Sequence, residues 1–257
     1  MKTIAKLLVL SCILYLVSLP SVFAAPAIQH WTTANGARVY YVHAPELPMV
    51  DIQFIFDGGS ARDGDHPGVA LLTNALLDQG AGELDADAIA GRLEGVGARL
   101  STSAHRDMAI IGLRSLTDEA LLQPALEVLE LILGQPRFPA SALERERKRM
   151  LVALQAKAQD PGDIAQKAFF RALYGKHPYA TPSLGTEQSL RALSRDDVSA
   201  HHRRYYVAHN AVVAVVGALP RAQVEALVEK LAAVLPAGDK APPLPPVPPL
   251  NKAVERH

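Results

Sequence analysis

The chain has 257 residues with 26 basic and 26 acidic side chains, so its formal net charge is zero. This balance gives no electrostatic reason to expect nucleic acid or an anionic membrane surface as a partner. The single cysteine, Cys12, excludes an intramolecular disulfide and any site built from several cysteine ligands.

Residues 1–24 have the pattern of a secretory signal peptide. Two lysines precede the apolar run Leu7 to Val17, and small residues lead to a cleavage position after Ala24. An uncleaved anchor and a lipoprotein attached at Cys12 remain alternatives, although the run is short for an anchor. Removing 24 of the 257 residues leaves 233, with 24 basic and 26 acidic side chains. We expect a secreted, periplasmic protein without membrane attachment after cleavage.

Strands are predicted first in the mature chain. Asn35-Gly36, between polar and β-prone residues, predicts a hairpin over Thr32 to Val42. Val50 to Phe56 alternates apolar and polar side chains, which predicts a half-buried strand before the turn Asp57 to Ser60. Further strands are predicted over 98–103, 108–114 and, as a fully buried strand, 210–217.

Helical periodicity fills the intervals between and after these strands. The predicted helices cover 67–79, 85–95, 118–134, 141–158, 162–174, 194–206 and 220–235. Ser141 with Glu144, and Ser194 with Asp197, predict capping boxes at two helix starts. On the first helix, the face predicted to meet the core consists of Val69, Leu72, Thr73 and Leu76. Because strands and helices are mixed, with hairpins first, we expect an α+β fold.

The C-terminal segment 239–257 reads as a proline-rich linker. Proline has no N–H donor and a fixed φ, so Pro242 to Pro249 cannot form a helix or a central strand. A stiff, extended segment is therefore predicted. We expect residues 25–238 to form one domain and the chain to be cut before a second, homologous domain.

Several motifs follow one another between Val39 and about Leu235. They are Phe54 to Asp63, Gly68 to Gly80, Gly97 to Ser103, Glu144 to Arg147, His177 to Pro182, Leu184 to Leu190, Tyr206 and Asn210 to Gly217. This ordered set resembles one half of a pitrilysin/insulinase-type subunit, an inverted zincin. The resemblance implies a mostly antiparallel sheet packed against helices on one face. It also implies two such halves, joined by a linker around a chamber.

Catalytic members of that family carry H-x-x-E-H on the helix after the third strand, and a later helix supplies a third ligand, a glutamate. Positions i and i+4 share a helix face, so two imidazoles can bind one zinc ion, while the intervening glutamate acts as general base. Aligned to this pattern, Leu71 and Ala75 replace the histidines, and Asn74 replaces the base. Ala153 replaces the third ligand, and Glu146 lies on the same helix face. The resemblance therefore implies a degenerate site without catalytic or metal-binding residues.

Histidines elsewhere offer weaker candidates for a metal site. Asp197 and His201 have i,i+4 spacing, with His202 and His209 nearby, but an exposed helix face is the preferred interpretation, because local spacing without a third ligand is a weak signal. His177, in the family's H-P-Y motif, is expected to shape a loop. His66 could cap the following helix.

We therefore expect a non-catalytic subunit of a secreted heterodimeric zinc peptidase. Its partner would carry H-x-x-E-H and the zinc ion, whereas this chain would hold no cofactor and would help to form the peptide-binding chamber. Two alternatives stay open. One is an active metallopeptidase with an unusual metal site near His201 and His202, and the other is a stand-alone peptide-binding or scaffold protein.

Overall fold

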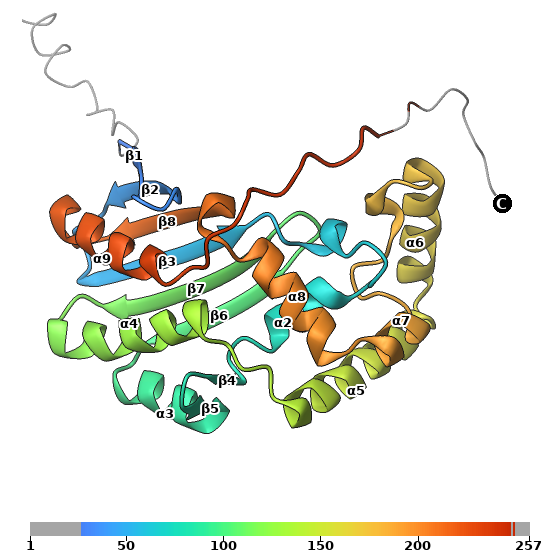
Figure 1. The fold of residues 1–257 in the computed structure, drawn as a ribbon, viewed down its shortest axis with the longest axis horizontal. Coiled ribbons are helices and arrows are strands. Elements are labelled where there is room, and N and C mark those ends of the chain that lie inside the picture. Colours follow the sequence, from blue (N-terminus) through green and yellow to red (C-terminus); the bar gives the residue numbers. More distant parts are fainter. Residues whose placement is uncertain (1–26, 248, 250–257) are drawn as a thin grey trace, which may run out of the picture.

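The computed structural model describes residues 27–247 and residue 249, so the predicted signal peptide lies outside the described residues. A six-stranded sheet is covered on one face by helices, and further helices gather beyond one end of the sheet (Figure 1). Its strands are β1 (Gln29–Thr32), β2 (Arg38–His43), β3 (Met49–Phe56), β6 (Arg99–Ala104), β7 (Ala109–Leu116) and β8 (Ala211–Gly217). A separate two-stranded ribbon pairs β4 (Gly80–Ala81) with β5 (Leu84–Asp85).

The longer helices are α4 (Glu119–Gly134), α5 (Ala140–Lys157), α6 (Pro161–Tyr174) and α9 (Arg221–Ala233). The shorter ones are α2 (Val69–Ala75), α3 (Ala86–Gly95), α7 (Glu187–Ala192) and α8 (Arg195–Tyr205). Three 3-10 turns, η1 (Ser60–Arg62), η2 (Pro178–Ala180) and η3 (Ala208–Asn210), complete the elements. No helix among residues 27–247 is both long and apolar enough to cross a membrane.

The sheet has the order β1-β2-β8-β3-β7-β6, and every neighbouring pair is antiparallel except β2 with β8. The expected α+β fold with a mostly antiparallel sheet is therefore confirmed. The hairpin predicted around Asn35-Gly36 joins β1 to β2, and Gly36 has a φ of 95°. A side chain there would be strained and would also meet the His209 imidazole, 2.5 Å from an ideal Cβ.

The sheet is buried on its helix-covered face. In β3 the alternating residues Val50, Ile52, Phe54 and Phe56 are at most 1 % exposed, as the alternation predicts. β8 also alternates, and its Val216 is 44 % exposed. The prediction of a fully buried last strand is thus wrong, because helices cover only one of its faces.

Helix α2 begins at a buried carboxylate. Asp63 accepts hydrogen bonds from the backbone N–H groups of Gly68 (2.7 Å) and Ala70 (3.0 Å), which a helix start leaves without partners. Burial raises the pKa of Asp63 to about 7, outweighing the opposite effect of these two hydrogen bonds. The four residues predicted to face the core, Val69, Leu72, Thr73 and Leu76, are all buried. The helix ends at Ala75, earlier than predicted, where the chain turns toward β4.

One of the two predicted capping boxes is present. Ser194 and Asp197 exchange side chain and backbone hydrogen bonds at the start of α8, as predicted. The prediction of a capping box at Ser141 and Glu144 is wrong, because the residue that precedes the first turn of α5 is Pro139. Ser141 therefore lies inside the first turn, where its hydroxyl cannot act as a cap.

Residues 236–247, which we call the strap, follow α9 without regular structure and run across the body of the protein (Figure 1). Five body side chains hydrogen-bond its backbone: His209 to Gly238 O, Arg204 to Asp239 O, Asn210 to Ala241 N, Arg62 to Pro242 O and His177 to Pro245 O. In Figure 1 this part of the predicted linker follows an extended path, with neither helix nor strand. The strap is also docked, which its composition did not indicate.

Candidate functional site

Two of the four predicted degenerate positions lie on the wall of one cavity, which has a volume of about 860 Å³. Leu71 reaches it from α2 and Ala153 from α5, and these two helices are in contact. Helix α6 and the loop 180–185 form the remaining walls. Residues separated by 82 positions in the sequence (71 and 153) thus line the same cavity.

The other two positions lie beside the cavity, outside its wall. Asn74 is 2 % exposed, and its Nδ2 donates to the carbonyl oxygen of Ile110 (3.3 Å) and to the Tyr206 hydroxyl (3.4 Å). Ala75 is half-buried. Asn74 therefore links α2 to β7 and to the end of α8, which is a structural role for a residue at the general-base position.

The chemistry of these side chains does not fit a zinc ion. Leu71, Ala75 and Ala153 present only hydrocarbon, and zinc binds nitrogen, oxygen or sulfur donors. Glu146, 7 % exposed, forms an ion pair with Arg149 (2.8 Å) and does not line the cavity. Among residues 27–247 and 249, no three His, Cys, Asp or Glu side chains are grouped so that they could hold a metal ion.

The histidines of α8 are structural. His201 and His202 are each 5 % exposed, so the predicted exposed helix face is wrong. His201 Nε2 bonds the carbonyl oxygen of Gly58 (3.1 Å), and His202 stacks on Tyr206 with ring centroids 4.8 Å apart. Burial lowers the pKa of both imidazoles to about 4, and they are neutral near pH 7.

Two further histidines have roles in loop structure. His177 Nδ1 accepts from the backbone N–H of Tyr179 (3.1 Å), so its Nε2–H donates to the strap at Pro245 O (2.9 Å). This agrees with the loop-shaping role expected for the H-P-Y motif. His66 is not the cap of α2, because the carboxylate of Asp63 accepts the first N–H groups.

The cavity combines apolar walls with basic side chains. Its larger apolar residues are Leu71, Leu154, Ile164, Phe170 and Leu184. Its charged residues are Arg106, Lys157, Lys167, Arg171 and Asp163, four positive and one negative. Reasoning from the sequence missed these basic residues, although the i,i+4 spacing of Lys167 and Arg171 on an amphipathic helix was a usable signal.

The loop 180–185 is fixed in place. Arg106 donates to the carbonyl oxygens of Tyr179 and Thr181, and its guanidinium lies 4.4 Å from the centroid of the Phe170 ring. Ser60 Oγ bonds Ser183 Oγ at 2.8 Å. These contacts, on both the turn before β7 and the turn after β3, preform the cavity.

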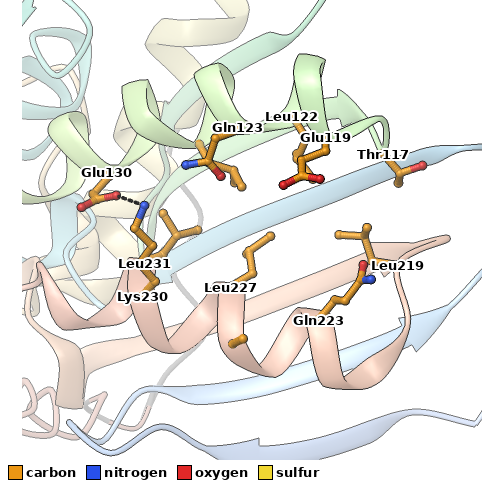
Figure 2. A pocket seen from close by; sticks show the side chains of 12 residues that line it. Thr117, Glu119, Leu122, Gln123, Glu130, Leu219, Gln223, Leu227, Lys230 and Leu231 are labelled. Carbon is orange, nitrogen blue, oxygen red and sulfur yellow. Dashed lines mark ion pairs between the residues drawn. The ribbon is translucent and has the colours of Figure 1, made fainter.

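A second concave region, of about 570 Å³, lies between α4 and α9. Figure 2 shows its leucine side chains between the two helices, with the Lys230–Glu130 ion pair (3.0 Å) at one end. Its remaining polar groups are amides, one hydroxyl and the carboxylate of Glu119. The region offers no set of metal ligands or nucleophile, and we treat it as a packing groove.

Comparison with known protein families assigns both parts of the chain. Residues 38–187 match the family described as Insulinase (Peptidase family M16), and residues 192–257 match the Peptidase M16 inactive domain. The first match alone covers more than half of the chain.

Individual relatives agree with this assignment. A Helicobacter pylori protein named non-peptidase homolog YmxG is 29% identical over 201 residues, 76% of this chain and 45% of that protein. A crystal structure described as the peptidase M16 inactive domain from Pseudomonas fluorescens is 41% identical, with a TM-score of 0.84, and the match covers 85% of this chain and 53% of that one.

The first half of the periplasmic protease PqqL from Escherichia coli shares the fold, with a TM-score of 0.77 at 18% identity, over 87% of this chain and 51% of that one. The chain spans about half the length of the relatives it matches. With the cavity geometry and the family match together, the chain belongs to the insulinase family of peptidases, family M16, as a degenerate member.

Proposed function

We propose that this chain belongs to a non-catalytic subunit of an exported, heterodimeric zinc peptidase. The subunit forms part of the wall of a peptide-binding chamber. The zinc ion and the H-x-x-E-H motif are supplied by a catalytic partner of the same family.

One observation carries the proposal. Leu71 and Ala153, which the family alignment puts at two ligand positions, line one cavity, and neither side chain can bind a metal ion. A pocket without ligands or base cannot activate water, yet the loop 180–185 and the contacts of Arg106 still preserve its shape. A subunit that binds peptides needs a cavity of fixed shape, but it needs neither metal ligands nor a general base.

The pairing has support from the relatives. The H. pylori relative is named a non-peptidase homolog, and the PqqL match is described as the first half of a larger protease. Both agree with a protein that contributes one wall of a larger assembly. The exposed apolar side chains Val152 (65 %), Ile164 (52 %) and Phe169 (60 %), on α5 and α6, give such an assembly a surface to cover.

The test uses the mature, full-length protein. We expect it to co-purify with an H-x-x-E-H-bearing protein encoded in its own genome neighbourhood. We also expect the complex, but not this subunit alone, to retain zinc through dialysis against a mild chelator. Changing the glutamate of the partner's motif to glutamine should abolish peptide cleavage by the complex. Failure to bind any such protein, or stoichiometric zinc in the isolated subunit, would contradict the proposal.

Export to the periplasm is a separate part of the proposal. It rests on the sequence pattern of residues 1–24, and amino-terminal sequencing of the protein from a periplasmic fraction tests it. A mature chain that begins at Ala25 is the expected result. A chain beginning at Met1 would contradict export, whereas one beginning at Cys12 would replace cleavage after Ala24 by lipoprotein processing.

A stand-alone peptide-binding protein is the second candidate, because the basic cavity could bind a ligand without any partner. A stable monomer or homodimer that binds peptides and ignores H-x-x-E-H proteins would favour it. An active metallopeptidase built on His201 and His202 gains no support, since both imidazoles are buried against other groups.

A further inference from the structure

We infer that the cavity between α2, α5 and α6 binds acidic peptide segments, and that it takes a large apolar side chain flanked by carboxylates. The inference deepens the proposed peptide-binding role by naming the class of peptide. It begins with the replacement of the ligand positions, because Leu71 and Ala153 make apolar the part of the wall where zinc ligands are expected.

The apolar part of the cavity is suited to one bulky side chain. Leu71, Leu154, Phe170 and Leu184 contribute to its walls from three helices and the loop. Its volume of about 860 Å³ is within the range of roughly 300–1,000 Å³ typical of ligand pockets. Ile164, at the same wall, is 52 % exposed, so burial of its surface by a ligand would be favourable.

The charge of the cavity selects an anionic ligand. Four basic side chains and one acidic one line it, a net charge of +3. Asp163, the single acid, already pairs with Lys157 at 2.7 Å. Within the described residues, Lys167 and Arg171 form no ion pair, and as i,i+4 neighbours on α6 they lie on one helix face. They are free to pair with carboxylates of a ligand.

The hydrogen-bonding groups favour a peptide over a simple amphipathic anion. Gln166, Thr181 and Ser183 add amide and hydroxyl groups to the wall, and these can bond peptide N–H and C=O groups. Arg106 holds the loop that carries two of them, so the groups are placed before binding.

Fluorescence anisotropy with short labelled peptides tests the inference on the purified mature protein. The probe carries a Glu-Phe-Glu core in a glycine-serine context. Gln-Phe-Gln and Glu-Ala-Glu versions remove the charge and the apolar group separately, and a Lys-Phe-Lys version reverses the charge. We expect each change to weaken binding by about tenfold or more, and added salt to weaken binding of the Glu-Phe-Glu probe.

Two pairs of variants assign the binding to the cavity. Ala153→Trp places an indole in its apolar part and should weaken binding strongly, whereas Ala156→Trp, on the same helix but outside the cavity wall, should not. The double change Lys167→Glu with Arg171→Glu should weaken binding of the Glu-Phe-Glu probe and improve that of Lys-Phe-Lys, while Lys148→Glu on α5 should do neither. The α6 changes lie on an exposed helix surface, so they test the inference even if Ala153→Trp fails to fold.

Several outcomes would overturn the inference. Equal affinity for Glu-Phe-Glu and Gln-Phe-Gln would exclude charge selection. Unchanged binding in folded Ala153→Trp would place the ligand elsewhere. Dodecanoate that bound more tightly than every peptide would make the occupant a fatty acid. Because the assay contains no partner, these results are independent of whether the subunit pairs with a catalytic protein.

Discussion

Leu71, Ala75 and Ala153 determine whether the site can bind a metal. If the alignment places them correctly, the changes Leu71→His, Ala75→His and Ala153→Glu together should create a zinc site with one ion per chain. Two imidazoles at i,i+4 and a carboxylate from the neighbouring helix provide the necessary donors. Asn74 is kept, because it holds β7 and Tyr206.

The matched control for this graft moves only the carboxylate. In the same double-histidine background, Ala156→Glu replaces Ala153→Glu, which places the acid one turn away, outside the cavity wall. Elemental analysis after dialysis should find zinc in the first protein and much less in the second. Equal zinc content in both would show that Ala153 is not the third ligand position.

The buried histidines of α8 predict a dependence of stability on pH. The pKa of His202 is about 4 in the folded protein and has its usual value of 6.5 in the unfolded chain. Between pH 4 and pH 6.5 the unfolded chain therefore binds more protons than the folded protein. The free energy of unfolding therefore falls as the pH drops from 6.5 to 4, by at most roughly 3 kcal/mol for this imidazole. His201 acts in the same direction.

His202→Phe should reduce the loss of stability between pH 7.5 and pH 5, by roughly 2 kcal/mol, since phenylalanine keeps the ring contact with Tyr206 but cannot titrate. Urea unfolding at the two pH values measures the difference. Phe138→Leu, which alters the same aromatic cluster without removing a titrating group, should be equally destabilising at both. An unchanged pH dependence in His202→Phe would contradict the assignment.

Asp63 affects the pH dependence of stability in the opposite direction to the two histidines. Its pKa is raised to about 7, above the ordinary value of 3.8, so between these values the folded protein binds more protons than the unfolded chain. The free energy of unfolding contributed by this residue therefore decreases as the pH rises from 3.8 to 7. The pH dependence of stability in this range therefore combines contributions of opposite sign from Asp63 and the two histidines, which is why the variant comparison is needed.

At the scale of elements, the docked strap predicts where a protease can cleave the chain. Ala241 is 6 % exposed and its N–H donates to Asn210, so the bond after Lys240 should resist a lysine-specific protease. Asn210→Ala removes that acceptor, together with the Nδ2 donor to the carbonyl oxygens of Asp57 and Tyr205, and should accelerate cleavage after Lys240 about fivefold or more.

Cleavage elsewhere separates local release from unfolding. In Asn210→Ala, the rate of cleavage after Lys148, in the middle of α5, should stay unchanged if only the strap is released. Gln188→Ala, an exposed amide on α7, is the control variant and should change neither rate. Equal acceleration at Lys148 and Lys240 in Asn210→Ala would mean that the residue supports the whole fold and not the strap alone.

Local elements could be predicted because their causes are local. Neighbouring residues alone determine three correctly predicted features: the alternation of β3, the Asn35-Gly36 turn and the Ser194–Asp197 capping box. The prediction failed where the cause was distant. The exposure of Val216 depends on which sheet face the helices cover, and the burial of His201 depends on Gly58, more than 140 positions away.

At the scale of the whole molecule, the same limit applies to the site. Alignment to a family pattern named Leu71 and Ala153, which the fold does bring to one cavity. It did not place Arg106, Lys167 and Arg171 together, because their common location depends on how α6 and the turn before β7 are arranged around the cavity. The docked strap escaped prediction for the same reason, since its hydrogen-bond partners are spread from Arg62 to Asn210.

The position of β8 has a consequence for folding. β8 (residues 211–217) is the last strand of the described residues, yet it lies in the sheet between β2 and β3. These two strands do not pair with each other, and each pairs with β8. Until that strand is available, β1–β2 and β3–β7–β6 are two separate pieces with no shared hydrogen bonds. Such non-local closure is slow. The six-stranded sheet therefore cannot be completed until residues 211–217 have been synthesised.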